Sequence, residues 1–141
     1  MLRGMATVVF YADDVAEARA WYTEFLGIEA YFERRTPEGD LGYAEFRIGD
    51  FEAEFGLVQR QFEVTPSGGP GGAILFWAVD DLDAALARLV ELGAKVYDEP
   101  RSRGEGFMTA SVVDPFGNIL GIMTNVHYRS IVDQNRDKRL G

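Results

Sequence analysis

The sequence of 141 residues contains no cysteine and a single histidine, His127. Without cysteine there are no disulfide bonds, thiolate metal sites or cysteine nucleophiles, and nothing indicates an oxidising compartment. One histidine with no placed acid partner provides neither a cluster of imidazole ligands nor a catalytic triad. We therefore interpret His127 as a residue of the tail or of an interface.

The chain also lacks long apolar runs and has few cations. No run approaches the length of a membrane span, and Met1 to Met5 lacks the apolar segment of a secretory signal. The 14 Lys and Arg against 23 Asp and Glu give a formal net charge of −9, which repels nucleic-acid phosphates and anionic lipid. We expect a cytoplasmic protein with no membrane or nucleic-acid partner, whose charge favours cations.

An internal repeat is the most informative feature that is present. In the first half a β-rich run precedes an acidic helix cap, an apolar helical stripe and a glycine that ends the helix. The same order recurs in the second half at nearly the same spacing. The two copies are Met5–Ala12, Asp14 and Gly27, and Ala73–Val79, Asp81 and Gly93.

Each predicted helix is followed by three strand candidates, so each half follows the pattern β-α-β-β-β. In the first half they are Ile28–Arg34, Tyr43–Ile48 and Glu52–Val58, and in the second Ala94–Tyr97, Phe107–Val113 and Ile119–Asn125.

The composition between and after the halves predicts the domain boundaries. Residues 65–72 are rich in Pro and Gly, which is typical of a linker. We expect one module over residues 1–64 and a second over 73–125. The C-terminal tail is residues 126–141, and its polar part from Ser130 to Gly141 is expected to be a short arm or disordered.

A turn near the end of the second half connects this pattern to a family. Asp114-Pro115-Phe116-Gly117-Asn118 is a reverse turn between strands. Together with the two Asp-capped helices and their Leu-Gly ends, it resembles the vicinal oxygen chelate superfamily, which includes glyoxalase I, extradiol dioxygenases, fosfomycin-resistance enzymes and bleomycin-binding proteins. The resemblance covers about residues 5 to 125. It implies an α+β fold of two tandem βαβββ modules, forming a curved eight-stranded half-barrel sheet with a concave trough.

The metal-dependent members of that superfamily bind their ion through four positions on the first and last strands of the modules. The resemblance places Thr7, Gly56, Ile74 and Gly121 at these positions. Divalent first-row ions need imidazole, thiolate or carboxylate donors, which these residues do not supply. We therefore expect no metal and no cofactor, and we expect the two glycines to leave room for a ligand.

Strand alternation from these positions predicts which side chains line the trough. Alternatively, the aromatic residues are core, Glu54 is a solvated edge residue, and Arg34-Arg35 is an exposed strand end rather than an anion clamp. The predicted ligand-binding residues are Thr7, Val9, Tyr11, Tyr43, Glu45, Arg47, Glu54, Gly56, Ile74, Phe76, Phe107, Thr109, Ser111, Gly121 and Met123.

Three functions follow as hypotheses. The first is a metal-independent binding protein, resembling the bleomycin-binding branch, that sequesters a small aromatic and possibly cationic compound. The second is a metal-independent lyase or isomerase of the same fold, with Glu45, Glu54, Tyr11 and Tyr43 as its candidate acid and base groups. The third is an interaction module. Resembling proteins usually form homodimers, which is the assembly we expect.

Overall fold

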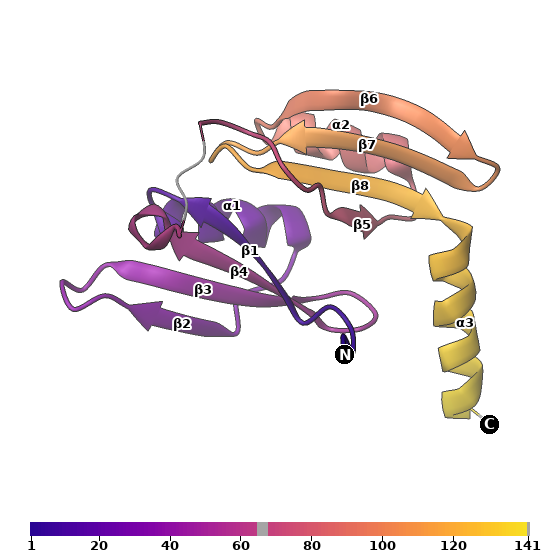
Figure 1. Cartoon of the computed structure of the whole chain (residues 1–141), viewed down its shortest axis with the longest axis horizontal. Coiled ribbons are helices and arrows are strands. Elements are labelled where there is room, and N and C mark those ends of the chain that lie inside the picture. The colour runs from indigo at the N-terminus through magenta and orange to yellow at the C-terminus, as the bar shows by residue number, and fades with distance from the viewer. Residues whose placement is uncertain (65–67, 141) are drawn as a thin grey trace. The chain divides into compact units, whose positions relative to one another are not determined.

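The computed structural model describes residues 1–64 and 68–140. The chain divides into two compact units, Met1–Gly69 with Phe116–Asn118, and Pro70–Pro115 with Ile119–Gly141. The predicted α+β class is confirmed: the described residues form eight strands in two four-stranded sheets, together with three α-helices (Figure 1). Of the linker expected at 65–72, residues 65–67 lie outside the described residues, and residues 68–72 form neither helix nor strand.

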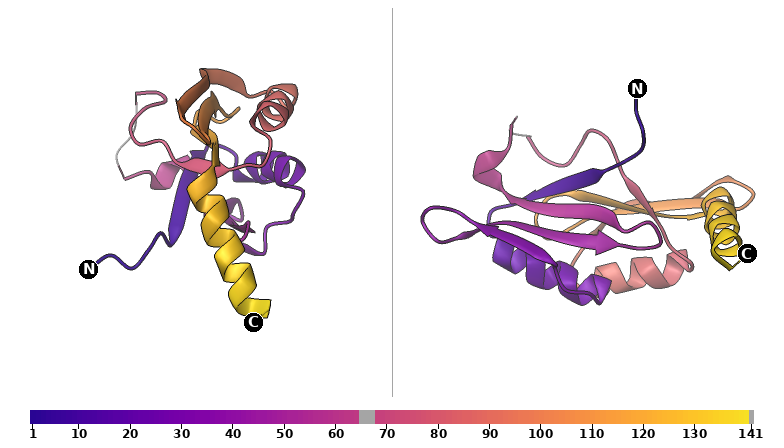
Figure 2. Two further views of the ribbon diagram at one scale, coloured as in Figure 1. Left: turned by 90° about the vertical axis from the view of Figure 1, so that its right-hand side faces the viewer. Right: turned by 90° about the horizontal axis from the view of Figure 1, so that it is seen from below.

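The first unit consists of a four-stranded sheet with one helix on one face (Figure 2). Asp14 caps the helix by accepting a hydrogen bond from the backbone N–H of Glu17, and Gly27 ends it at φ 71°. The strand order is β1-β4-β3-β2, with β1 parallel to β4. The elements are β1 (Thr7–Ala12), α1 (Val15–Leu26), β2 (Phe32–Arg35), β3 (Leu41–Ile48), β4 (Ala53–Gln59) and the short 3-10 helix η1 (Arg60–Phe62).

The core of the first unit is aromatic. Phe10 of β1 and Phe55 of β4 meet edge to face at 5.2 Å between ring centroids, and Tyr22 of α1 lies 4.9 Å from Phe55. Tyr22 and Phe55 are each 1% exposed. Edge-to-face packing suits these rings because it brings the positive rim of one against the negative face of the next. The helix therefore fixes which face of the first sheet is buried.

The second unit repeats the arrangement, with strand order β5-β8-β7-β6 and β5 parallel to β8. Asp81 caps its first helix through the N–H of Ala84, and Gly93 follows the helix at φ 104°. The elements are β5 (Phe76–Ala78), α2 (Leu82–Glu91), β6 (Lys95–Gly104), β7 (Phe107–Val113), β8 (Ile119–Asn125) and α3 (Val126–Leu140).

Two strands of the second unit differ from the prediction. β5 has only three residues, whereas Ala73–Val79 was expected. β6 extends to Gly104, beyond the expected end at Tyr97, and its pairing with β7 shifts register between Asp98 and Arg101. Pro100 lies inside that shift and has no N–H to donate. A register shift of this kind lets the strand continue past the proline, beyond the end that the sequence predicted.

Residues 130–140, predicted to be either a short arm or disordered, are part of a helix. α3 begins directly after β8, and the side chain of Asn125 accepts a hydrogen bond from the N–H of Tyr128 at 2.9 Å, which caps its first turn. Arg129 forms an ion pair with Asp80, the residue before the cap of α2. No residue of α3 is buried, so the apolar periodicity that would have predicted a helix is missing.

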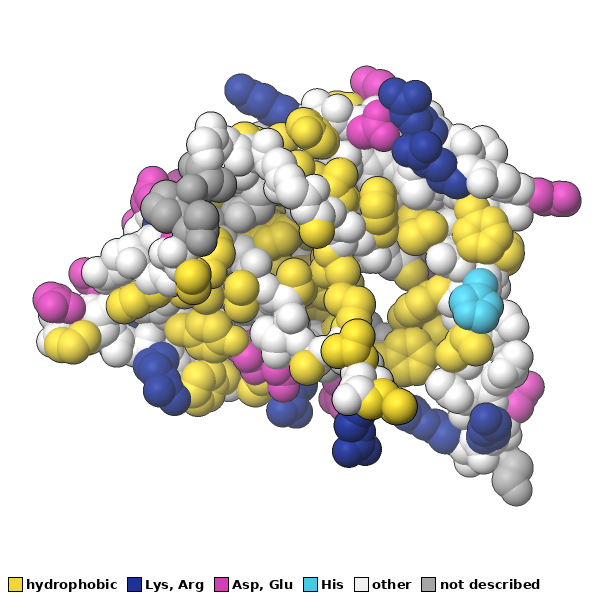
Figure 3. Space-filling view, in the orientation of Figure 1, with side chains coloured by type: hydrophobic (Ala, Val, Ile, Leu, Met, Phe, Trp, Pro, Cys, Tyr) yellow, Lys and Arg dark blue, Asp and Glu magenta, His cyan; other side chains and the backbone are white. Residues whose placement is uncertain are grey.

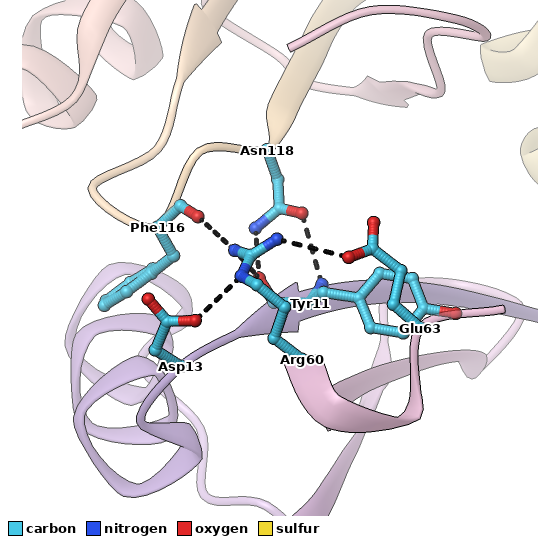
Figure 4. Close-up of polar contacts among 6 residues, drawn as sticks. All are labelled: Tyr11, Asp13, Arg60, Glu63, Phe116 and Asn118. Carbon is cyan, nitrogen blue, oxygen red and sulfur yellow. Dashed lines mark hydrogen bonds and ion pairs between the residues drawn. The ribbon is translucent and has the colours of Figure 1, made fainter. Parts of the chain in front are cut away.

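The turn at Phe116–Asn118 belongs to the first unit although its flanking strands belong to the second. The amide of Asn118 makes two hydrogen bonds with the backbone of Tyr11, donating to its carbonyl at 2.9 Å and accepting from its N–H at 3.2 Å (Figure 4). Arg60 donates to the carbonyl of Phe116 at 2.9 Å and pairs with Asp13 at 2.9 Å. The turn is therefore held by an amide and a guanidinium that satisfy backbone carbonyls.

Across residues 1–64 and 68–140, no helix has the length and hydropathy needed to cross a membrane.

Candidate functional site

Strand register determines which side chains share the face of the first sheet away from α1, here called the helix-free face. Residues paired across neighbouring strands point to the same side of a sheet. The three rows on this face are Thr7, Glu54 and Arg47; Val9, Gly56, Glu45 and Phe32; and Tyr11, Val58, Tyr43 and Arg34. The first unit thus brings together eight of the residues predicted from the sequence, those from Thr7 to Gly56.

Four polar residues on the helix-free face form two hydrogen-bonded pairs, which we call the polar cluster. The hydroxyl of Thr7 donates to the carboxylate of Glu54 at 2.5 Å. The hydroxyl of Tyr43 donates to the carboxylate of Glu45. Among the described residues neither carboxylate forms an ion pair. The guanidinium of Arg47 lies over the ring of Tyr31, 4.5 Å from its centroid.

Burial and mutual repulsion change the proton affinity of this cluster. Desolvation, together with the negative charge of Glu54, raises the pKa of Glu45 above its usual value, and Arg47 offsets this only in part. Desolvation and Glu54 likewise raise the pKa of Tyr43. The helix-free face therefore holds two neighbouring carboxylates, Glu45 and Glu54, whose repulsion Arg47 offsets only in part.

The space expected at Gly56 is filled. A Cβ built at this position would lie 2.7 Å from the hydroxyl of Tyr43 and 2.9 Å from its Cε2. The phenol of Tyr43 thus lies across the glycine, where it reaches Glu45. The expectation that this glycine leaves room for a ligand is wrong, because the neighbouring strand supplies a ring that occupies the room.

The space at Gly121 in the second sheet is also filled by neighbouring atoms. Its Cβ would lie 2.6 Å from the carbonyl oxygen of Leu75 and 2.7 Å from Cδ1 of Phe76. Here a backbone atom as well as a ring fills the space, so the expectation of free room is wrong at this position too. The methyl Cγ2 of Ile74 is 3.0 Å from the same point.

The remaining predicted residues lie in the second unit and are mostly apolar. Phe76, Gly121 and Ser111 form one row, and Met123 pairs with Thr109 in the next, while Phe107 pairs with Asn125. Thr109 accepts a hydrogen bond from Arg103 at 3.0 Å. The hydroxyl of Ser111 is buried and has no hydrogen-bond partner among the described residues.

Two neighbours of the polar cluster were not predicted. β2 places Phe32 beside Glu45 and Arg34 beside Tyr43, on the helix-free face. The alternation of Phe32 and Arg34 along the strand indicated that both side chains point to one face. This alternation was not used in the prediction, because the strand was expected to begin at Ile28, where the structure has no strand.

Comparison with known proteins identifies the family. Residues 4–122 match the Glyoxalase/Bleomycin resistance protein/Dioxygenase superfamily. The chain belongs to this superfamily. Solved structures of similar fold include a glyoxalase-related enzyme from Fulvimarina pelagi (TM-score 0.67, 20% identity, covering 88% of this chain and 89% of that chain).

Two further structures extend the similarity. TioX from Micromonospora sp. ML1 has a TM-score of 0.64 at 16% identity, covering 86% of this chain and 98% of that chain. A glyoxalase/bleomycin resistance protein from Streptomyces sp. CB03234 has a TM-score of 0.62 at 25% identity, covering 84% of this chain and 98% of that chain. No curated protein matches the sequence.

The residues at the superfamily's metal positions do not fit a divalent ion. Thr7 and Ile74 offer no imidazole or carboxylate, and the side-chain space at Gly56 and Gly121 is occupied by other atoms of the chain. Within residues 1–64 and 68–140, no group of three or more His, Asp or Glu side chains lies close enough to hold a metal ion.

Proposed function

We propose that this superfamily member binds a small planar amine or other organic cation on the helix-free face of its first sheet, without a metal. The observation that carries the proposal is the pair of acids in the polar cluster. Glu45 and Glu54 are close enough for one to raise the pKa of the other, and neither has an ion-pair partner among the described residues. A cation placed between them would relieve that repulsion.

The surroundings of the cluster support an aromatic ligand. Tyr43 and Phe32 meet edge to face, with 6.2 Å between their ring centroids, and Phe32 is 41% exposed. Exposed rings beside carboxylates suit a planar cation, because the rings contact its face while the acids meet its charge. In Figure 3, hydrophobic side chains gather over the strands of the first unit, with acidic and basic side chains beside them.

A matched ligand series tests the proposal. Isothermal titration of 2-naphthylmethylamine and its neutral alcohol should show tighter binding of the amine. Glu54→Gln should weaken the amine severalfold and reduce the salt dependence of its binding, because one carboxylate loses its charge. Glu52→Gln is the control, since it removes an equal charge from an exposed residue just before β4. Equal binding of the amine by wild type and Glu54→Gln would identify Glu54 as a solvated edge residue.

The hydrogen bond between Tyr43 and Glu45 favours one alternative, a metal-independent lyase or isomerase. Both groups have raised pKa values, so Glu45 retains a proton at a higher pH than an ordinary carboxyl and is able to donate one. Mass spectrometry of a bound amine before and after incubation distinguishes the two functions. An unchanged mass and isomer composition supports sequestration, whereas conversion that Glu45→Gln abolishes supports the enzyme.

We further propose that the protein is a homodimer in the cytoplasm, as the sequence and the family resemblance predicted. Val9 is 40% exposed and Tyr31 is 47% exposed, and surface hydrophobics of this kind are often covered by a second copy. Light scattering at micromolar protein should give twice the mass of the 141-residue chain. A monomer mass would contradict the prediction.

A further inference from the structure

A cavity of about 410 Å³ lies within the first unit, at the end of the sheet where β2 and β3 form a hairpin. Its walls include Phe32 and Arg34 from β2, Tyr43 from β3, Val58 from β4 and Phe62 from η1. This volume falls within the range of small-molecule sites, roughly 300 to 1,000 Å³. We call it the hairpin pocket.

The charge of the hairpin pocket is opposite to that of the polar cluster. Arg34 and Arg35 both line it, and among the described residues no Asp or Glu does. Arg35 donates to the carbonyl of Gly39 in the hairpin turn at 3.2 Å, so part of its guanidinium is already engaged. Arg34 forms no ion pair among the described residues; its guanidinium carbon lies 5.7 Å from the ring centroid of Phe32.

The geometry selects the chemistry of the ligand. A guanidinium held beside a ring keeps its planar N–H edge available, and that edge matches the two oxygens of a carboxylate. Phe62, 54% exposed, and Phe32 provide apolar surface for an aromatic ring. A monoanion also suits a chain of net charge −9 better than a doubly charged phosphate does.

We propose that the hairpin pocket binds a planar aromatic carboxylate, with its carboxylate on Arg34 and its ring between Phe32 and Phe62. The pocket adjoins the proposed cation site on the same face but is anchored by a different residue, Arg34, and it gives this arginine the anion-binding role that was weighed against an exposed strand end. Phe32 and Tyr43 belong to both sites: their rings line the pocket, and the hydroxyl of Tyr43 bonds Glu45.

The test uses 2-naphthoate and its neutral analogue 2-naphthamide, titrated calorimetrically at low salt. Wild type should bind 2-naphthoate more tightly than the amide. Arg34→Gln should weaken 2-naphthoate about tenfold or more, because a hydrogen bond to a charged group is lost, and should leave the amide unchanged. Arg35→Gln should have a smaller effect, since this guanidinium is already bonded to Gly39. Phe62→Ala should weaken both compounds alike.

Two control variants separate this proposal from others. Arg101→Gln removes an equal charge from an exposed arginine of β6 and should bind 2-naphthoate like wild type. Glu54→Gln removes a negative charge from the same face, so it should weaken 2-naphthylmethylamine but not 2-naphthoate. Failure of the cation site and failure of the hairpin pocket therefore give different results. The proposal is overturned if wild type does not bind 2-naphthoate at millimolar concentration, if the amide binds equally well, or if Arg34→Gln binds like wild type.

Discussion

Replacing Gly56 with alanine tests the packing of Tyr43 across the first sheet. The new methyl group would lie 2.7, 2.9 and 3.1 Å from three atoms of the Tyr43 phenol. Contacts under 3 Å force one partner to move. The ring is the partner that moves, and moving it disturbs its hydrogen bond to Glu45 and its edge-to-face contact with Phe32.

The cost has two parts. Overpacking of a fitted site costs about 1–3 kcal/mol. Displacing the phenol also breaks its hydrogen bond to Glu45, and a hydrogen bond to a charged group is worth roughly 1.5–3 kcal/mol when buried. Since Tyr43 and Glu45 are only partly buried, solvent replaces much of the second part. We therefore expect Gly56→Ala to lower the free energy of unfolding by about 2 kcal/mol.

A double-mutant cycle with Tyr43→Ala identifies the cause. With the ring removed, the new methyl group meets no clash, so Gly56→Ala should hardly change the free energy of unfolding. The coupling energy between the two positions should then be about 1–2 kcal/mol. Gly121→Ala with Phe76→Ala provides the contrast. There the nearest atom is the carbonyl oxygen of Leu75, a backbone atom, so removing the ring should not restore stability.

Chemical denaturation of the six variants and of wild type measures these energies. The reasoning is refuted if Gly56→Ala is as stable as wild type, or if its cost is the same with and without the Tyr43 ring. Rescue of Gly121→Ala by Phe76→Ala would show that the backbone of Leu75 yields more easily than its position indicates.

Three other predictions concern the first unit and its chemistry. Glu45→Gln keeps an acceptor for Tyr43 and removes a carboxyl whose pKa is raised, so the variant should be more stable than wild type near neutral pH. This gain in stability should disappear below about pH 4, where Glu45 of the wild type is protonated too. A gain that stays constant across a pH series of thermal melts would contradict the prediction. Asn118→Ala loses both hydrogen bonds to the Tyr11 backbone and should cost about 1–3 kcal/mol in urea denaturation, whereas an unchanged midpoint would mean that water replaces the amide. Zn²⁺, Ni²⁺, Mn²⁺ or Fe²⁺ should not raise the melting temperature, and stoichiometric metal in protein purified without chelator would disprove this.

Local chemistry made much of the fold predictable. Asp14 and Asp81 cap helices because their carboxylates accept backbone N–H groups, and this signal depends on a few adjacent residues. β7 and β8 have the predicted bounds, since their apolar runs end at turn residues. The prediction was poorer where tertiary context decides. β6 continues past Pro100 through a register shift, and α3 has no apolar stripe to indicate it.

The candidate site was predictable only in part. Alternation along β1, β3 and β4 predicted one shared face for Thr7, Glu45 and Glu54, because side-chain direction follows from strand period. The sequence could not show that Tyr43 covers Gly56, since that depends on the rotamer of a residue on the neighbouring strand. The hairpin pocket also required the register of β2, which brings Arg34 beside Tyr43. The ligands of the two proposed sites are tested by the calorimetric titrations described above.

The position of the Phe116–Asn118 turn has a consequence for splitting the gene. A fragment that ends in the linker carries the whole first sheet, but it lacks Phe116 and Asn118. Asn118 forms hydrogen bonds with the backbone N–H and carbonyl of Tyr11, and the carbonyl of Phe116 accepts a hydrogen bond from Arg60. The complementary fragment keeps this turn without its partners. Although the sequence looks like a tandem duplication, the second half contributes a turn to the first unit. We therefore expect the first fragment to be less stable alone than when it is expressed together with the second.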